Sequence, residues 1–298
     1  MESFFEKMKK SFLPKYKEFR LSLHLMNRNK LSQLSMIILI ILVVAAILAP
    51  YIAPYPGDIY GEVHMGSALQ PPSKDHILGT DEVGRDIFSR LLQGTRISLA
   101  CSIIIVLICA VFGAILGAAA GTLGRWIDDV LMRITDIFMA FPPLLLTIAF
   151  SALLGASLKN AIIAMMLTWW PPYARLMRNS ALTIRERPYV KAAEAIGTKK
   201  LRITVKHIMP NCIAPLIIQA SMDMGAVILS LASLSFLGLG AQSPQPEWGL
   251  MISTSRAYFL NCPWYSIFPG LAIVITVLAM NLIGDGLREV LDPKTKKN

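Results

Sequence analysis

The fold of this chain is decided by apolar stretches such as LSMIILIILVVAAILAPYI, which occupies residues 34–52 and contains no charged side chain. A helix needs about 20 mostly apolar residues to cross the hydrocarbon core of a bilayer. Apolar residues make up 54% of the 298-residue sequence and charged residues only 16%, whereas soluble domains contain about 45–50% and about 25%. The chain is therefore predicted to be an all-α integral membrane protein.

Further apolar runs bring the number of predicted transmembrane helices to six. Two of these runs are interrupted by proline pairs, Pro142 with Pro143 and Pro171 with Pro172. Proline is tolerated within a span where neighbouring helices satisfy the freed carbonyl groups, so these two spans are predicted to be surrounded by other helices. The predicted spans are residues 34–52, 97–121, 134–154, 161–176, 213–239 and 265–283.

The positive charges indicate how these spans are oriented. Of the 29 Lys and Arg residues, 23 fall in the N-terminal segment, the second-to-third connection, the fourth-to-fifth connection and the C-terminal tail. Cytoplasmic loops of membrane proteins carry an excess of Lys and Arg, so these segments and both termini are predicted to be cytoplasmic. The same bias accounts for the net charge of +10 without a nucleic-acid partner.

This topology divides the chain into four predicted regions, with a long cytoplasmic loop and a long outer loop inside the third. They are a cytoplasmic N-terminal segment at 1–33, a first span with its outer loop at 34–96, a core of five spans at 97–287 that includes the cytoplasmic loop 177–212 and the outer loop 241–263, and a cytoplasmic tail at 288–298.

Motifs for catalysis and for nucleotide binding are missing from the sequence. It lacks the GxxxxGK[ST] pattern that cradles nucleotide phosphates, and it lacks the GxSxG and HExxH patterns of hydrolases. The four cysteines and four histidines have neither disulfide nor zinc spacing. We expect no catalytic residue, no metal site and no directly bound cofactor, so the chain is not predicted to be an enzyme.

Two acidic residues lie at or within the predicted spans, where ionisable side chains are functional candidates by default. Asp136 is near the cytoplasmic face and is expected to pair with Arg133 or Arg125. Asp223 lies in the cytoplasmic half of the fifth span and is a candidate for contact with a substrate or an ion.

Small residues form a regular pattern in the second span. Gly113, Gly117 and Gly121 recur at four-residue spacing in GAILGAAAG and leave one face of the helix flat. Such a face allows close helix–helix packing. The second span is therefore predicted to pack tightly against protein.

The stretch VKAAEAIGTKKLRITVKHIMPN at residues 190–211 gives the predicted cytoplasmic loop its own structure. Apolar residues at helical spacing predict one short helix before Gly197 and another after it, because glycine commonly ends a helix. The apolar positions are Val190, Ala193 and Ile196, followed by Leu201, Val205 and Ile208.

This loop resembles the EAA loop of binding-protein-dependent ABC transporter permeases, which reads EAA, three residues, Gly, nine residues and IxLP. Gly197 and Pro210 match that pattern, His207 is typical of the peptide permeases, and Lys191 replaces the usual glutamate. The resemblance implies that the loop seats in a groove of an ATPase subunit. The residues implied in this coupling are Lys191, Ala192, Ala193, Glu194, Gly197, His207, Pro210 and Asn211.

Other stretches resemble the C-type permease subunit of the dipeptide/oligopeptide/nickel ABC importer family, which has a type I ABC importer permease fold. They are HILGTDEVGRDIFSRLLQGTRISL at 76–99, LSFLGLG at 234–240, PQPEWGLMI at 244–252, PWYSIFPGLAI at 263–273 and NLIGDGLREVLDPK at 281–294.

The resemblance implies a permease for di- or oligopeptides in the inner membrane. Its implied partners are a B-type permease subunit in a heterodimer, two ABC ATPases that carry ATP and Mg²⁺, an extracytoplasmic substrate-binding protein, the peptide and membrane lipid. Glu247, Trp248 and Trp264 would face the binding protein. For the two tryptophans, an aromatic belt at the membrane interface is an equal alternative.

Four other interpretations are weighed against this one. A secondary transporter or channel should carry more ionisable residues in its spans. A DNA-binding regulator needs an exposed base-reading face, which a loop tied to two spans restricts. A membrane-surface helix explains the charges but gives Ala192, Ala193 and Gly197 no role. A nickel or metallophore importer of the same family stays open, because its permeases share these motifs.

Overall fold

The computed structural model describes residues 30–291, and within them the chain is helical with no β-strand, so the predicted all-α class is confirmed. The predicted segment 1–33 and tail 288–298 lie mostly outside the described residues. The helices are α2 (Lys30–Ile52), α3 (Pro56–Tyr60), α4 (Ile87–Leu123), α5 (Arg125–Met139), α6 (Pro143–Leu154), α7 (Leu158–Trp169), α8 (Pro171–Arg185), α9 (Pro188–Ala195), α10 (Lys200–Ile203), α11 (Ile213–Phe236), α12 (Trp248–Ser255) and α13 (Pro263–Leu291).

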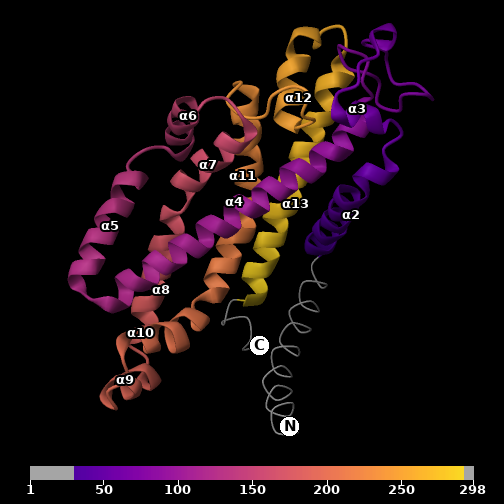
Figure 1. Cartoon of the computed structure of the whole chain (residues 1–298). Helices are drawn as coiled ribbons and strands as arrows, with labels where there is room; N and C mark the ends of the chain where they lie inside the picture. Colours follow the sequence, from indigo (N-terminus) through magenta and orange to yellow (C-terminus); the bar gives the residue numbers. More distant parts are fainter. Residues whose placement is uncertain (1–29, 292–298) are drawn as a thin grey trace, which may run out of the picture.

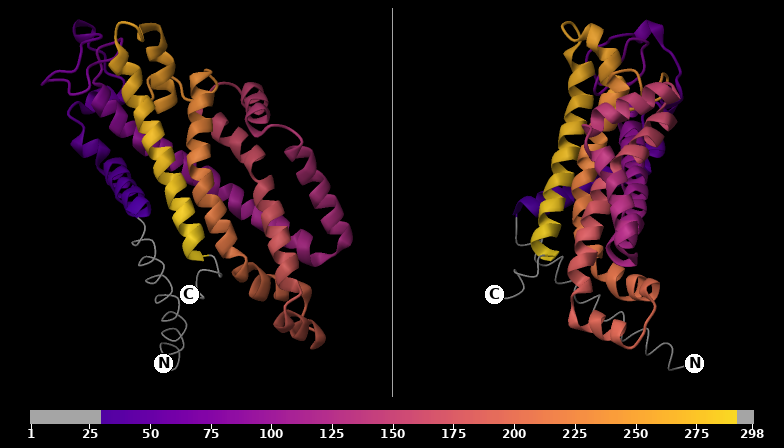
Figure 2. Two further views of the ribbon diagram at one scale, coloured as in Figure 1. Left: turned by 180° about the vertical axis from the view of Figure 1, so that it is seen from behind. Right: turned by 90° about the vertical axis from the view of Figure 1, so that its left-hand side faces the viewer.

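The helices form an elongated bundle with small structures at its two ends. The long helix α4 crosses the bundle obliquely and packs against α8, while α13 packs against both α11 and α2 (Figure 1). The short helices α9 and α10 lie together at one end, and α3 and α12 lie at the other (Figure 2). Two potential contact surfaces are therefore held at opposite ends of the molecule.

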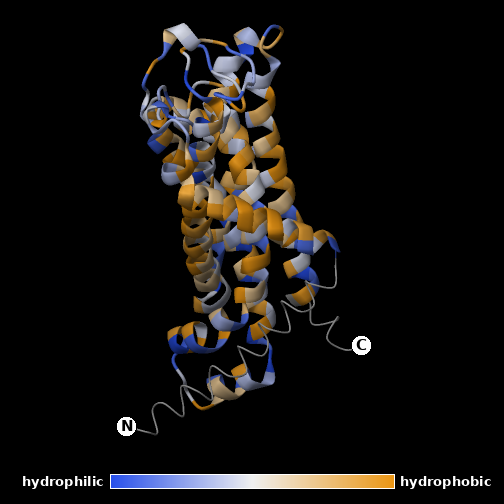
Figure 3. Ribbon diagram, turned by 90° about the vertical axis from the view of Figure 1, so that its right-hand side faces the viewer, coloured by the Kyte–Doolittle hydropathy of each residue, from blue (hydrophilic) through white to orange (hydrophobic). Residues whose placement is uncertain are grey.

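Four helices, α2, α4, α11 and α13, are long and apolar enough to cross a membrane. Hydrophobic residues line the middle of the bundle and hydrophilic ones gather toward its ends (Figure 3). On α2, Ile40, Ile41 and Ile47 are exposed, as expected for side chains that face lipid. The pair α5 and α6 qualifies as a fifth span if its two bent halves are taken together. The count of six spans stays a prediction.

The proline pairs divide two of the predicted spans. Between α5 and α6 the chain bends by 87° at the break that precedes Pro143. The predicted span 161–176 is likewise divided, because α7 ends at Trp169 and α8 begins at Pro171. Proline has no amide hydrogen to donate, so each pair interrupts the hydrogen bonds of a helix. Before Pro143 the backbone also leaves the helical region, with a ψ of 126° at Pro142, whereas Trp170 before Pro171 keeps helical angles.

The second predicted span, residues 97–121, covers only part of the helix that the structure contains. Helix α4 has 37 residues and begins at Ile87. The first turns of α4 contain several polar residues, so the apolar pattern alone does not predict them as part of the helix. The Asp86 carboxylate caps the helix by accepting a hydrogen bond from the Ser89 backbone amide at 2.8 Å, which fixes the early start.

The glycine face of α4 packs against α8. A Cβ atom added to Gly117 would lie 2.1 Å from the Ala174 carbonyl oxygen, and one added to Gly113 would lie 2.7 Å from the Trp170 carbonyl oxygen. At Gly121 the nearest atom would be the Cβ of Ala181, at 2.9 Å. The backbones of α4 and α8 thus approach each other as closely as small residues permit.

Candidate functional site

The loop at residues 190–211 folds as a short helix, a turn and a second helical segment, which confirms the predicted helix–turn–helix. Helix α9 ends at Ala195, and Gly197 just beyond it has a φ of +78° that other residues adopt only with strain. The Gly197 amide donates to the Glu194 carbonyl at 3.0 Å and the Thr198 amide donates to the Ala193 carbonyl at 3.1 Å, which satisfies the helix end. The second segment is less regular than predicted, because α10 continues as a π turn at Thr204–Ile208.

The buried side of this loop is fixed to α4 and α8. Val190, Ile203 and Ile208 pack in one apolar cluster with side chains of both helices. The Thr204 hydroxyl donates to the Thr122 hydroxyl at the end of α4, at 2.8 Å, and both residues are buried. The loop is therefore attached to the helix pair by apolar packing and by a hydrogen bond, rather than hanging from its two ends.

Three apolar side chains of the loop are exposed, among basic residues such as Lys199, Lys200 and Arg202. Ile196 is 82% exposed, Leu201 65% and Val205 57%. Isolated exposed apolar residues are ordinary, but three on one short loop at the end of a membrane protein indicate a contact surface. We call Ile196, Leu201 and Val205 the loop patch.

The other coupling candidates lie around the loop patch. Lys191 is exposed and its ammonium is 3.2 Å from the Glu186 carboxylate, while Glu194 is 3.5 Å from Arg185. Ala192 and Pro210 are exposed and Ala193 is half-buried. The ring of His207 lies 6.5 Å from that of Tyr189, and the Asn211 side-chain amide donates to the His207 carbonyl at 2.6 Å.

A pocket of about 280 Å³ lies where the proline breaks meet. Its walls come from five helices and from the bend after α5, and Asp223 of α11 is the acidic residue among them. The lining residues are Phe138, Met139, Phe141, Pro143, Thr168, Trp169, Pro171, Pro172 and Asp223. The structure thus places Asp223 beside both proline pairs, a proximity that residues so far apart in sequence do not reveal.

Asp136 forms its ion pair with Arg175 of α8, not with Arg133 or Arg125 as expected. About two helical turns earlier on α5, the Asp128 carboxylate accepts two hydrogen bonds from the Arg178 guanidinium, at 2.9 and 2.6 Å. The reason is that α5 turns back along α8, so the nearest cations belong to α8 and not to α5. These two pairs tie α5 to α8 beside the pocket.

At the opposite end, Glu247 and Trp248 are buried, with exposures of 1% and 0%. The Trp248 indole donates to the Leu91 carbonyl at 3.2 Å and the Glu247 carboxylate caps α12 by accepting from the Leu250 amide at 3.0 Å. Burial raises the pKa of the Glu247 carboxyl above its ordinary value. Trp248 joins α12 to α4, and both side chains are enclosed in this structure, so the prediction that they face a binding protein is corrected.

The third docking candidate, Trp264, is half-buried. Its ring lies over Gly79, where an added Cβ would come within 2.8 Å of it. Its position therefore depends on the outer loop that precedes α4. The sequence pattern predicted aromatic residues at this end of the molecule, but it did not predict that Trp264 packs onto the polar loop before α4.

The sequence also missed a charged network in that outer loop. The buried Asp81 carboxylate is 2.6 Å from the Arg85 guanidinium and 3.5 Å from that of Arg90. Burial raises the pKa of the Asp81 carboxyl, although both arginines favour its ionised form. The Tyr265 hydroxyl donates to the neighbouring Glu82, which connects this loop to α13.

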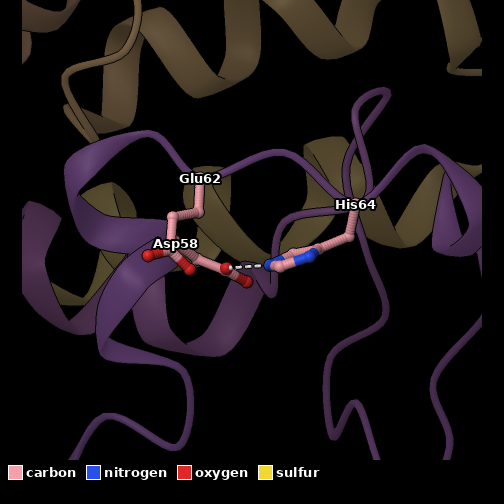
Figure 4. A group of neighbouring side chains, drawn as sticks. All are labelled: Asp58, Glu62 and His64. Atoms are coloured by element: carbon pink, nitrogen blue, oxygen red, sulfur yellow. Dashed lines mark hydrogen bonds and ion pairs between the residues drawn. The ribbon is translucent and has the colours of Figure 1, made fainter.

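Three potential metal ligands also lie together at this end, where no metal site was expected. Ligand atoms of Asp58, Glu62 and His64 all fall within 4.8 Å of one another (Figure 4). One oxygen of Asp58 is 2.8 Å from His64 Nε2, and the other accepts from the Asp86 amide at 2.6 Å. Both carboxylate oxygens of Asp58 already have partners within the protein. Asp58 therefore has a structural role, which is to join α3 to the start of α4.

Comparison with known proteins assigns the chain to a family. Residues 110–297 match the binding-protein-dependent transport system inner membrane component, and residues 19–72 match the N-terminal transmembrane domain of oligopeptide transport permease C. The chain belongs to this family of transporter permeases. With its long apolar helices, the permease is a multi-pass protein of the inner membrane.

The predicted resemblance to C-type subunits is confirmed by relatives that match most of the permease. It is 46% identical to the dipeptide transport system permease protein DppC of Alkalihalophilus pseudofirmus, over 91% of this chain and 88% of that protein. It is 43% identical to the probable D,D-dipeptide transport system permease protein DdpC of Escherichia coli K12, over 87% and 86%. It is 44% identical to the glutathione transport system permease protein GsiD of Pectobacterium atrosepticum, over 84% and 83%.

A solved structure supports the fold assignment. The permease aligns with a chain of the MetNI methionine ABC transporter in an inward-facing conformation, with a TM-score of 0.56 and 20% identity. The alignment covers 67% of the permease and 96% of that chain. The type I ABC importer permease fold is therefore shared, and it is the fold alone that this comparison shows.

Proposed function

We propose that the permease is the C-type half of the translocation pathway in an ATP-driven importer of di- and oligopeptides. The observation that carries this proposal is its 46% and 43% identity, over about nine tenths of its length, to permeases named for dipeptides and D,D-dipeptides. A B-type permease forms the other half of the pathway, and a substrate-binding protein delivers the peptide. Two partner ATPases bind ATP and Mg²⁺, so this chain has no enzymatic step of its own.

In this proposal, residues 190–211 couple ATP hydrolysis to movement of the helices. A coupling element must be stiff and must be attached to what it moves. The contact between Thr204 and Thr122 and the burial of Val190 and Ile208 provide that attachment to α4 and α8. The loop patch supplies an apolar surface that fits a groove in an ATPase subunit.

Lys191 gives this loop a property that distinguishes it from the family pattern. It occupies the position of the usual glutamate, and its exposed contact with Glu186 contributes little, because such surface pairs are worth about 0–1 kcal/mol. Lys191 is thus available to an acidic side chain of the ATPase, whereas the usual glutamate would require a basic one.

Reconstitution of the complete transporter tests the proposed function. The permease is purified with its B-type and ATPase subunits, placed in proteoliposomes and mixed with its binding protein. ATP hydrolysis is expected to rise several-fold with a dipeptide-loaded binding protein, but not with the unloaded one, because closure of the ATPases depends on the loaded complex. If nickel complexes, and not peptides, stimulate ATP hydrolysis, the substrate is a nickel complex and the peptide assignment is wrong. If neither stimulates ATP hydrolysis, the proposal that the complex is an importer of this class is contradicted.

A further inference from the structure

The pocket between the proline breaks carries an inference about the substrate, and this inference rests on the proposed function. We infer that the pocket is a subsite for the ammonium group of a transported peptide, with the Asp223 carboxylate as its counter-charge. Most of the other pocket residues are apolar or aromatic, and together with Asp223 they enclose about 280 Å³. Pockets for whole drug-sized ligands are about 300–1,000 Å³, so this one suits one end of a dipeptide.

Asp223 lacks a cationic partner among the described residues. Among the described residues, Asp128 and Asp136 each have an arginine partner, whereas Asp223 forms no ion pair. Its Oδ1 accepts a hydrogen bond from the Gln219 amide at 2.9 Å, which orients the carboxylate without neutralising it. A carboxylate within a membrane span normally pairs with a positive charge or marks a substrate path.

Two further polar groups, the Tyr173 hydroxyl and the Trp169 indole N–H, are buried near this carboxylate. The Tyr173 hydroxyl is buried and has the Asp223 carboxylate as its interaction partner. The indole N–H of Trp169, a pocket residue, is buried without a partner. Most buried polar groups are hydrogen-bonded, so an unpaired indole N–H in the same pocket as a carboxylate indicates a ligand that also brings an acceptor, such as the carbonyl group next to the ammonium group of a peptide.

Aromatic side chains form part of the pocket wall. Phe138, Phe141 and Trp169 line the same pocket as Asp223. Aromatic rings attract a cation within about 6 Å of their centres, and the attraction grows when the cation leaves water. A carboxylate among aromatic rings therefore favours an organic ammonium group over a neutral amide.

The pocket lies at two breaks in the helices. Non-helical backbone at membrane depth is tolerated where it is buried in protein or lines a cavity. The bend of 87° before α6 and the interruption between α7 and α8 both border this pocket. The breaks and the carboxylate thus have one shared explanation, which is a binding position along the path.

Binding of a dipeptide to the purified complex without its binding protein tests the inference. In lipid nanodiscs, radiolabelled glycyl-leucine should bind saturably to the wild-type complex, and about tenfold or more weakly to the Asp223→Asn variant, because the counter-charge is lost. Asp223→Glu keeps the charge and should restore most of the affinity. Asp129→Asn removes an exposed carboxylate on α5 and serves as the matched control, with wild-type affinity expected.

Further ligands separate the ammonium group from other cations. N-acetyl-glycyl-leucine, which has no ammonium group, should bind no better to the wild-type complex than to Asp223→Asn, and methylammonium should compete with glycyl-leucine where K⁺ does not. Equal affinity of the wild type and Asp223→Asn, absence of saturable binding to the wild type, or competition by K⁺ alone would each overturn the subsite. Peptide-stimulated ATP hydrolysis, measured on the same preparations, tests the importer separately, since it can persist when the subsite inference fails.

Discussion

Replacing Gly117 with leucine is expected to prevent the permease from accumulating in folded form. A Cβ atom at this position would lie 2.1 Å from the Ala174 carbonyl oxygen and 2.8 Å from the Met177 Cβ. The first is a backbone atom of α8 and the second is bonded directly to that backbone. The clash is therefore relieved only if α4 and α8 move apart. We expect a cost of at least about 3 kcal/mol, seen as loss of the monodisperse peak in fluorescence-detected size-exclusion chromatography of detergent extracts.

Gly270→Leu is the matched control for this substitution. Gly270 also lies in a long apolar helix, α13, but a Cβ there would meet no atom within 4 Å. The control variant should retain wild-type amounts of folded protein. If Gly117→Leu accumulated as well as Gly270→Leu, the close approach of α4 and α8 would not be what holds the bundle together.

The second large effect is expected at the loop patch. Ile196→Asp should lower peptide-stimulated ATP hydrolysis about tenfold or more, because a charge in the centre of an apolar contact loses the energy of that contact and is itself desolvated. Ile196 is 82% exposed, so the substitution leaves the internal packing of the permease unchanged. The amount of permease in the membrane should therefore stay at the wild-type level while the coupled activity falls.

Leu260→Asp provides the comparison for this variant. Leu260 is 92% exposed and lies between α12 and α13, at the end opposite the loop patch. Leu260→Asp introduces the same charge as Ile196→Asp, and the purified complex should retain its ATPase subunits, whereas Ile196→Asp should weaken their binding. Equal loss of the ATPase subunits in both variants would mean that added surface charge, rather than a contact of the loop patch, causes the effect.

The sequence predicted those parts of the fold that depend on local patterns. Apolar runs found the long helices, the proline pairs marked the interruptions, and Gly197 marked the end of α9. These features follow from the conformational preferences of a residue and its close neighbours. The start of α4 was missed because its first turns are polar and their helical form depends on the Asp86 cap.

Contacts between distant segments could not be predicted. The glycine pattern indicated a tight interface, but nothing in it identifies α8 as the partner. Trp248 looked like an exposed aromatic residue of an outer loop, and only the packing of α12 on α4 shows that it is buried. The pocket at Asp223 likewise depends on the bend after α5, which brings residues from distant parts of the sequence to its walls.

The most direct test of the account is a cysteine cross-link from the loop patch to an ATPase subunit. The four native cysteines are buried, so Ile196→Cys places an accessible thiol at one known position and Leu260→Cys places one at the opposite end. In the assembled transporter, a short photoactivatable maleimide on residue 196 should form a product with the ATPase, and the same reagent on residue 260 should not. A cross-link to the ATPase from residue 260 and none from residue 196 would contradict the account.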